Sequence, residues 1–302
     1  MSAYRTSPIK RKRRSNDEMD TLLATIKTII SEYDDDPITI RHLFYRLVAA
    51  RAFPKDEREY SKLCAHLAKW RRSGDIAYDA FVDGTRWHVA STTFDDAADA
   101  LRDSVTSYRK NLWQDQDHYV EVWVEKDAIM SLVAPVANSW GIPTFPCRGF
   151  ASISSTYSCA QTFKRAIQKG KTPVILYMGD HDPSGVAIDV SLMKHMGDYG
   201  IADEVEFHRV AILVDQIAEF NLPTRPPKKN DGRGKGWVGE CVEIDTLSTA
   251  QIKELLEERI ESYVDQDAWN RTKAIEQAER DCLVDLFNNN RTVLASAGQE
   301  AE

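Results

Sequence analysis

The sequence predicts an α/β protein that carries a small α+β domain at its N-terminal end. From residue 117 onward, strand-like and helix-like segments alternate, whereas before residue 93 three amphipathic helical segments precede a hairpin signal. Charge divides the chain at nearly the same place, because residues 1–90 carry a net +4 and residues 91–302 a net −12. At 302 residues, two domains are the expected organisation.

The first domain is expected over residues 19–92. Helical periodicity covers residues 19–30 and 40–50, with Thr39 as a cap, and a third helix starts near residue 60 and stops at Gly74. Strand-like stretches at 76–82 and 87–89 flank Asp83-Gly84, a hairpin signal. This order is that of a winged helix-turn-helix, and a small helical bundle with a hairpin is the alternative. On its third helix, four cations are candidate DNA contacts: Lys62, Lys69, Arg71 and Arg72.

The second domain is expected over residues 117–287, after a bridging helix at 93–116. The alternation predicts a parallel sheet covered by helices on both faces, since parallel strands need crossover connections. The predicted strands are 119–124, 142–146, 173–178 and 205–214. The predicted helices are 128–139, 155–168, 186–196, 252–264 and 274–287.

Composition limits the classes of function. The fractions of apolar residues, 42%, and charged residues, 28%, are those of a globular protein, and no apolar run approaches the roughly 20 residues of a membrane span. Five cysteines without a Cys-x-x-Cys pair argue against a disulfide framework or a zinc ribbon, so we expect a reducing cytoplasm. The basic tail at 1–18 is either a solvated disordered tail, an arm for phosphates or a localisation signal, and residues 288–302 are expected to form a polar tail.

A second basic stretch, residues 225–237, is rich in glycine and proline and is expected to form an exposed loop. Its cations suit a phosphate backbone, and Trp237 could stack on a base. The candidate DNA contacts in this loop are Lys228, Lys229, Arg233 and Lys235.

Acidic residues follow two predicted strands directly. Glu125 comes after the strand at 119–124, and Asp180 and Asp182 come after the strand at 173–178. Ligands bind at the carboxyl ends of strands in open α/β sheets, so neighbouring strands would bring these carboxylates together. Carboxylates that share one edge repel each other unless a cation neutralises them, and hard oxygen ligands suit Mg²⁺, with Mn²⁺ as a possible substitute. A structural alternative makes Asp182 the N-cap of the next helix, with Pro183 at its first position, and both interpretations can hold together.

One tyrosine of the second helix has a basic neighbour. Arg41 and Tyr45 are four residues apart and share a helix face, so the guanidinium could favour the phenolate and bind a phosphate under attack. Taken alone, an amphipathic tyrosine is more often a core residue.

These residues resemble a known family. Glu125 followed by Asp180-x-Asp182-x-x-Gly185 is similar to the toprim domain, a Rossmann-like parallel sheet, over about residues 117–215. Together with Arg41-His42-Leu43-Phe44-Tyr45, the pattern resembles the A subunit of topoisomerase VI and its relative, the meiotic double-strand-break transesterase, in particular the short stand-alone members called mini-A, which are phage- or plasmid-borne. His42 departs from the pattern, since the family commonly has an acid there.

The resemblance implies that Tyr45 attacks double-stranded DNA and forms a 5′-phosphotyrosyl link, that Arg41 assists, and that the three acids hold Mg²⁺. It also implies a homodimer whose active sites are shared between protomers, and a nucleoid-associated location. We expect no nucleotide site, because Gly170-Lys171-Thr172 has Arg165 where a phosphate loop needs glycine, so an ATPase B-type subunit would have to be separate.

Two alternatives stay open. The first is a metal-dependent nuclease in which water attacks and Tyr45 is only a core residue, whereas in the transesterase Lys126 is a further candidate phosphate contact. The second is a DNA-binding regulator without catalysis.

Overall fold

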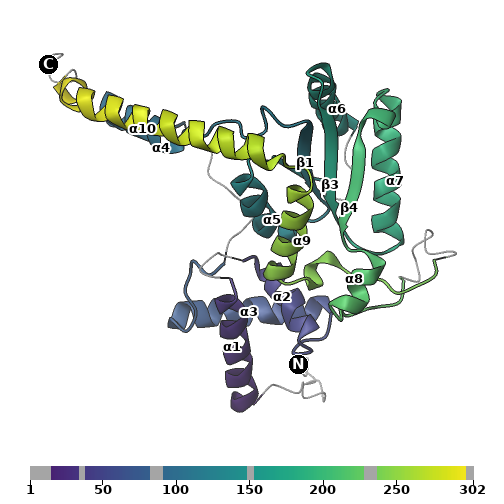
Figure 1. The fold of residues 1–302 in the computed structure, drawn as a ribbon. Coiled ribbons are helices and arrows are strands. Elements are labelled where there is room, and N and C mark those ends of the chain that lie inside the picture. The colour runs from purple at the N-terminus through teal and green to yellow at the C-terminus, as the bar shows by residue number, and fades with distance from the viewer. Residues whose placement is uncertain (1–14, 34–37, 82–90, 148–152, 228–236, 297–302) are drawn as a thin grey trace, which may run out of the picture. The chain divides into compact units, whose positions relative to one another are not determined.

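The computed structural model describes residues 15–33, 38–81, 91–147, 153–227 and 237–296, and the chain separates into two compact units, Met1–Val82 and Asp83–Glu302. The division lies ten residues before the boundary expected at residue 92. Figure 1 shows the helices and strands of each unit, most of them with labels. Within the described residues, every helix is too short or too polar to cross a lipid bilayer.

The described residues of the N-terminal unit form three helices: α1 (Asn16–Ser31), α2 (Ile40–Ala49) and α3 (Glu57–Ser73). Ser15 and Glu18 form a capping box at the start of α1, and Thr39 caps α2 as expected. Helix α3 begins earlier than the sequence predicted, because the Asp56 side chain accepts from the Arg58 amide and caps it. The apolar stripes meet in a core that includes Ile26, Leu43, Leu47, Leu63 and Leu67, all with no exposed surface.

The strand expected at 76–82 is wrong for residues 76–80, which form bends and turns. Arg71 Nη2 donates to the Tyr78 carbonyl at 2.7 Å, which holds this segment against the end of α3. Phe81 makes one parallel bridge to Ile38. The Asp83-Gly84 turn and the strand at 87–89 lie outside the described residues, so the hairpin of the expected winged helix stays a prediction.

The C-terminal unit is an α/β domain with a four-stranded, fully parallel sheet of order β2-β1-β3-β4, which confirms the α/β prediction. Its strands are β1 (His118–Val124), β2 (Thr144–Pro146), β3 (Thr172–Met178) and β4 (Glu206–Ala211). The crossover helices are α5 (Asp127–Ser139), α6 (Ile153–Gln168) and α7 (Pro183–Asp198). After the sheet come α8 (Val214–Glu219), α9 (Thr249–Glu261) and α10 (Gln266–Ser296).

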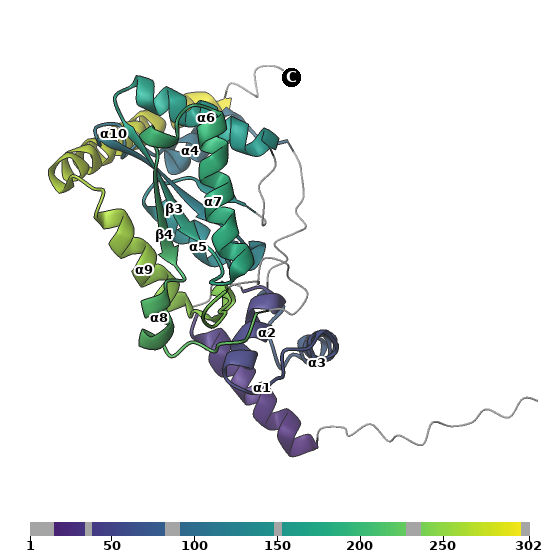
Figure 2. The same ribbon diagram turned by 90° about the vertical axis from the view of Figure 1, so that its right-hand side faces the viewer.

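Helices cover both faces of this sheet, and alternate side chains of one strand enter different cores. Trp123 and Tyr177 pack with Phe163 of α6 and Leu192 of α7, whereas α5 and α9 lie together on the opposite face (Figure 2). Because β1 and β3 are buried on both sides, they appear in the sequence as almost continuous apolar runs.

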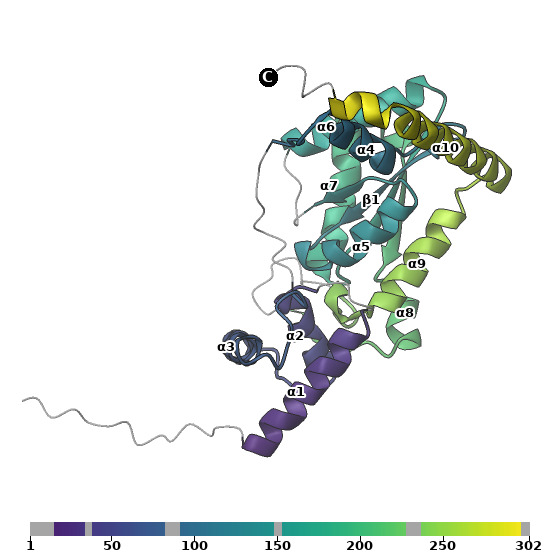
Figure 3. The same cartoon turned by 90° about the vertical axis from the view of Figure 1, so that its left-hand side faces the viewer.

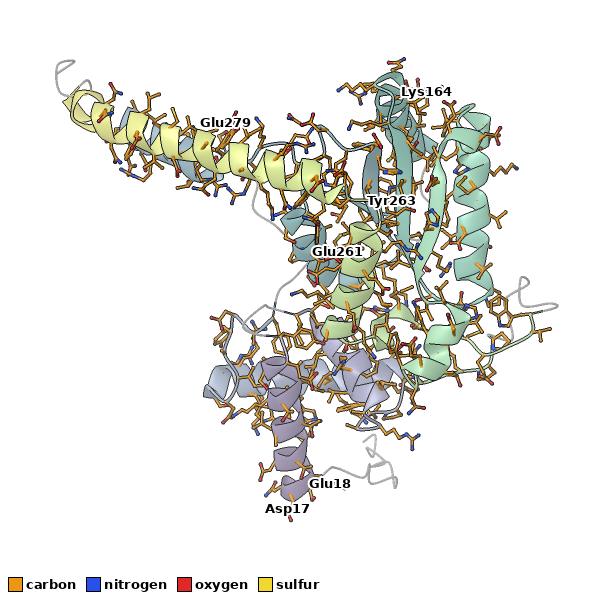
Figure 4. All side chains as sticks on the ribbon, in the orientation of Figure 1. Asp17, Glu18, Lys164, Glu261, Tyr263 and Glu279 are labelled. Carbon is orange, nitrogen blue, oxygen red and sulfur yellow. The ribbon has the colours of Figure 1, made fainter. Side chains whose placement is uncertain are left out.

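Two expected boundaries are wrong. The bridging helix is only α4 (Ala97–Ser107), and the chain then passes through turns that bury Leu112 and Trp113 before β1. Helix α10 is far longer than the predicted 274–287 and includes residues 288–296 of the expected polar tail. It lies along α4 (Figures 1 and 3), where Glu279, labelled in Figure 4, accepts from Tyr108 Oη at 2.5 Å and from Lys110 Nζ at 2.9 Å.

Candidate functional site

Glu125 lies where β1 ends beside β3. The two strands are in register up to Val124 and Met178, and the Glu125 amide donates to the Met178 carbonyl at 2.9 Å. The Glu125 carboxylate then accepts from the Asp180 amide at 2.8 Å and from Tyr177 Oη at 3.3 Å. Burial, and next the neighbouring charge of Asp180, raise the pKa of Glu125 to about 7. The sheet thus brings these two acids together, as their positions after neighbouring strands predicted.

Asp180 and Asp182 lie on the turn from β3 to α7, and both are almost buried, with 6% and 8% of their surface exposed. Asp182 Oδ1 accepts from the Gly185 amide at 2.8 Å and caps α7, and Pro183 occupies the first turn, as the structural interpretation predicted. A Cβ at Gly185 would lie 2.2 Å from the Asp180 carbonyl oxygen, so this turn requires glycine. Burial raises the pKa of Asp180 despite the opposing charge of Lys126.

Arg209 of β4 fixes the same turn, and the sequence did not identify it. Its guanidinium donates to the carbonyls of Gly179, Asp180 and Gly185 at 3.0–3.1 Å. It also forms a two-point pair with the Asp189 carboxylate, at 2.8 Å for each contact. The backbone around Asp180 is therefore held by the Arg209–Asp189 ion pair, which carries no net charge.

Residues 241–247 lie against the turn that carries Asp180 and Asp182. They add two further acids, which together with Glu125, Asp180 and Asp182 form the acidic cluster. His181 and Val242 exchange backbone hydrogen bonds of 2.9 Å, and the Ile244 amide donates to Asp180 Oδ1 at 2.9 Å. These contacts bring in two nearly or fully buried carboxylates that sequence reasoning missed, Glu243 and Asp245, with 8% and 0% of their surface exposed. The signal for them was the sequence Val-Glu-Ile-Asp-Thr-Leu, in which two acids lie among apolar residues.

Two cationic side chains lie among these acids. Lys126 Nζ is 2.9 Å from Asp180, 3.0 Å from Glu243 and 2.9 Å from Asp245. Burial alone would lower the pKa of Lys126, but Asp245, Asp180 and Glu243 together raise it. Arg225, which the sequence placed in the basic loop, pairs with Asp182 at 3.0 Å and with Glu243 at 3.3 Å.

The donor set suits a hard divalent cation, because it consists of carboxylate oxygens and the described part of the cluster has more acids than cations. Five carboxylates, those of Glu125, Asp180, Asp182, Glu243 and Asp245, surround two cationic side chains. Among the described residues, no three acidic, histidine or cysteine side chains are arranged to share one metal ion. The Lys126 ammonium lies between the carboxylates of Asp180, Glu243 and Asp245.

The remaining candidates of the basic loop have a mixed outcome. Lys228, Lys229, Arg233 and Lys235 lie outside the described residues. Trp237 packs against His181, with ring centroids 5.2 Å apart. The acid-bearing turn and the end of the loop are therefore neighbours.

In the N-terminal unit, Tyr45 is 9% exposed and lies beside two cations. Arg41 Nη2 approaches Tyr45 Oη at 3.5 Å, so the pair that the helical spacing predicted is formed. Lys55, which sequence analysis did not single out, lies 5.2 Å from the centroid of the Tyr45 ring. The Tyr45 phenol therefore lies next to two positively charged side chains.

His42 faces the interior of this unit. Its Nε2 is 2.7 Å from Tyr33 Oη, and burial, followed by the charge of Arg46, lowers the pKa of His42 to about 4. The ring is therefore neutral at pH 7, and it cannot replace the acid that the resembled family commonly has at this position.

The cations of α3 differ in their surroundings. Lys62, Lys69 and Arg72 are exposed, and Lys62 pairs with Glu59 one turn away. Arg71 is half-buried and stacks over Tyr78 and Phe81, so it stabilises the segment after the helix. Among these four, the exposed Lys69 and Arg72 are accessible to a phosphate backbone, and Lys62 is exposed but paired with Glu59.

Comparison with protein-family models, with curated proteins and with solved structures finds no match to this chain.

Proposed function

We propose that this chain is a metal-dependent, DNA-cleaving transesterase of the type IIB topoisomerase kind, with a winged-helix domain and a toprim domain. The observation that carries the proposal is the buried acidic cluster at the carboxyl ends of β1 and β3, in which Glu125 contacts the backbone of Asp180 and Asp182 caps the following helix. The Arg41–Tyr45 pair in the other unit supplies a candidate nucleophile. The resemblance of both motifs to topoisomerase VI A supports the same reaction.

In the proposed step, Tyr45 Oη attacks a DNA phosphorus and a new P–O bond to the phenol forms. The bond to the 3′ oxygen breaks, so the products are a 5′-phosphotyrosyl link and a free 3′ hydroxyl, and the proton lost by the phenol balances the one gained by the leaving oxygen. Arg41 stabilises the phenolate and binds a non-bridging phosphate oxygen. No redox partner or nucleotide is needed.

Glu125, Asp180 and Asp182 would hold the metal. Bound Mg²⁺ or Mn²⁺ would stabilise the negative charge that develops on the phosphate. Glu125 must lose the proton that its raised pKa favours before it can bind a cation, and Asp180 is kept in place by the Ile244 amide. Arg209 keeps the turn rigid, so the two aspartates do not reorganise when charge develops.

DNA contacts are proposed for the exposed cations of α3 and for the basic loop. A homodimer, in which the tyrosine of one protomer serves the acids of the other, and a separate ATPase B-type subunit are proposed from the resemblance. A nucleoid-associated location in the cytoplasm follows from a DNA substrate.

A metal-dependent nuclease is the second candidate, and the burial of Tyr45 favours it. With only 9% of its surface exposed, this side chain would have to become accessible before it could attack a phosphodiester. In a nuclease, water attacks and the acidic cluster alone carries the reaction.

Denaturing electrophoresis of the full chain with end-labelled duplex DNA and Mg²⁺ separates these candidates. The transesterase forms a labelled covalent adduct that Tyr45→Phe abolishes, whereas the matched variant Tyr60→Phe, which changes a tyrosine packed on Phe44 in the same unit, retains it. Cleaved ends free of protein in both variants would establish the nuclease instead. An adduct that persists in Tyr45→Phe would refute the assignment of the nucleophile, and DNA binding without cleavage would indicate the regulator.

A further inference from the structure

Lys126 occupies a position that resembles a cation site. Its ammonium nitrogen is in contact with carboxylates from two separate parts of the chain: Asp180 after β3, and Glu243 and Asp245 from residues 241–247. All three distances fall between 2.9 and 3.0 Å, so the charge is shared evenly among the three acids. An ammonium held in this way stands where a metal ion could stand.

Asp245 gives a second, independent observation. Its side chain has no exposed surface, and its Oδ2 contacts Lys126 while its Oδ1 has no hydrogen-bond partner. A buried carboxylate oxygen without a partner is costly, since buried polar atoms are almost always paired. The Lys126 ammonium therefore leaves Asp245 Oδ1 without a hydrogen-bond partner. A metal ion, which can coordinate more oxygen atoms, would satisfy it.

The size of the position also suits a divalent cation. Calcium takes oxygen ligands at 2.3–2.6 Å and magnesium at 2.0–2.1 Å, so the carboxylates would have to close in by about 0.3–1.0 Å from their distances to Lys126.

We propose that Asp180, Glu243 and Asp245 form one cation site, which holds either the Lys126 ammonium or a divalent metal ion, but not both. The inference rests on the proposed metal binding and adds Glu243 and Asp245 to its ligands. When a metal ion enters, Lys126 leaves the carboxylates and becomes available to a DNA phosphate. The phosphate contact expected for Lys126 is then a property of the metal-bound protein.

Amine acetylation of the full chain tests this exchange. The protein is given a short pulse of an acetylating reagent with and without Mg²⁺ or Ca²⁺, and acetylation at each lysine is quantified by mass spectrometry. We expect the metal to increase labelling of Lys126 at least fivefold. Lys171 is the matched control, because its ammonium is also held by three oxygens, the carbonyls of Trp113, Gln114 and Gln116, at the other end of β1, and its labelling should not change.

Binding of Mn²⁺, followed by electron paramagnetic resonance, separates two kinds of failure. If Mn²⁺ binds and the labelling of Lys126 stays constant or falls, the exchange is refuted and the proposed function is untouched. If Mn²⁺ does not bind at all, the metal site of the proposed function is itself refuted.

A variant adds a measurement that does not depend on labelling. Asp245→Asn should weaken Mn²⁺ binding at least tenfold, whereas Glu240→Gln, which changes an exposed acid of the same segment, should leave it within twofold. Equal affinities in the two variants, with folding verified by circular dichroism, would show that Asp245 is not a ligand.

Discussion

Replacing Glu125 with glutamine should change how the stability of the protein depends on pH. The carboxyl of Glu125 has an ordinary pKa of 4.5, which burial and then the charge of Asp180 raise to about 7 in the folded protein. Glutamine has nearly the same shape and can still accept from the Asp180 amide, but it does not titrate. The variant therefore removes a protonation equilibrium with little change in packing.

The sign follows from proton linkage. Between about pH 4.5 and pH 7, the folded state holds a proton on Glu125 that the unfolded state has released, so the free energy of unfolding falls as pH rises. A difference of 2.5 pKa units corresponds to at most about 3 kcal/mol, and the loss is complete above about pH 8. Relative to wild type, Glu125→Gln should gain stability across this window and reach its largest advantage at pH 8.

Urea unfolding of both proteins from pH 4.5 to pH 8.5, without divalent metal, measures this difference. The wild-type curve alone is not sufficient, because His42 contributes a slope of the opposite sign over about pH 4 to 6.5. The difference between variant and wild type cancels that contribution, since His42 is present in both. Glu240→Gln, at an exposed acid, serves as the control and should parallel wild type at every pH.

A difference between Glu125→Gln and wild type that does not change with pH would refute the reasoning. So would a wild type that is the more stable protein at pH 8, because it would mean that ionised Glu125 is stabilised by its surroundings. Saturating Mg²⁺ adds a second criterion: it should stabilise wild type more than the variant, since only a carboxylate gains a charge interaction with the metal.

Two further substitutions test the turn and the N-terminal core. Gly185→Ala should lower the free energy of unfolding, measured with urea, by roughly 1–3 kcal/mol, because the new Cβ would lie 2.2 Å from the Asp180 carbonyl oxygen. Gly197→Ala on the same helix is the control. Its new Cβ would lie 3.8 Å from the nearest neighbour, so this variant should be neutral or stabilising. His42→Asn should remove the loss of stability that wild type shows as pH falls from 6.5 to 4. In this range the unfolded state binds a proton on His42, whereas the buried ring of the folded state stays neutral. A variant that keeps the same acid-induced loss in urea unfolding would contradict this.

Periodicity predicted most of the fold because most of these elements bury one face or both. The run Pro-Val-Ile-Leu-Tyr-Met was identified as a buried strand, and it forms one of the two central strands of the parallel sheet. Helix α10 was predicted too short because only one stripe of it packs on α4, so its sequence is mostly polar and resembles a tail. The turns at residues 108–117 were misassigned as helix because Leu112 is buried there without belonging to any regular element.

The candidate site was predictable where topology alone brings residues together. Glu125 and Asp180 follow neighbouring strands, so their proximity is a consequence of strand order. Glu243 and Asp245 reach the same place through two isolated bridges and one amide contact, which no periodic pattern encodes. Arg225 was assigned to a DNA-binding loop because its sequence neighbours are basic, but its contacts are with acids distant in sequence.

The charges in the cluster explain how so many acids can be buried together without a metal. Lys126 and Arg225 neutralise two of the five carboxylates, and the raised pKa of Glu125 favours its neutral form. An excess of negative charge remains in the cluster, and a divalent cation would reduce it. A DNA phosphate adds a further negative charge and would be repelled while that excess persists. In the proposed function, entry of the metal would make this acidic cluster compatible with a polyanion, and the release of Lys126 would add a positive charge at the same moment.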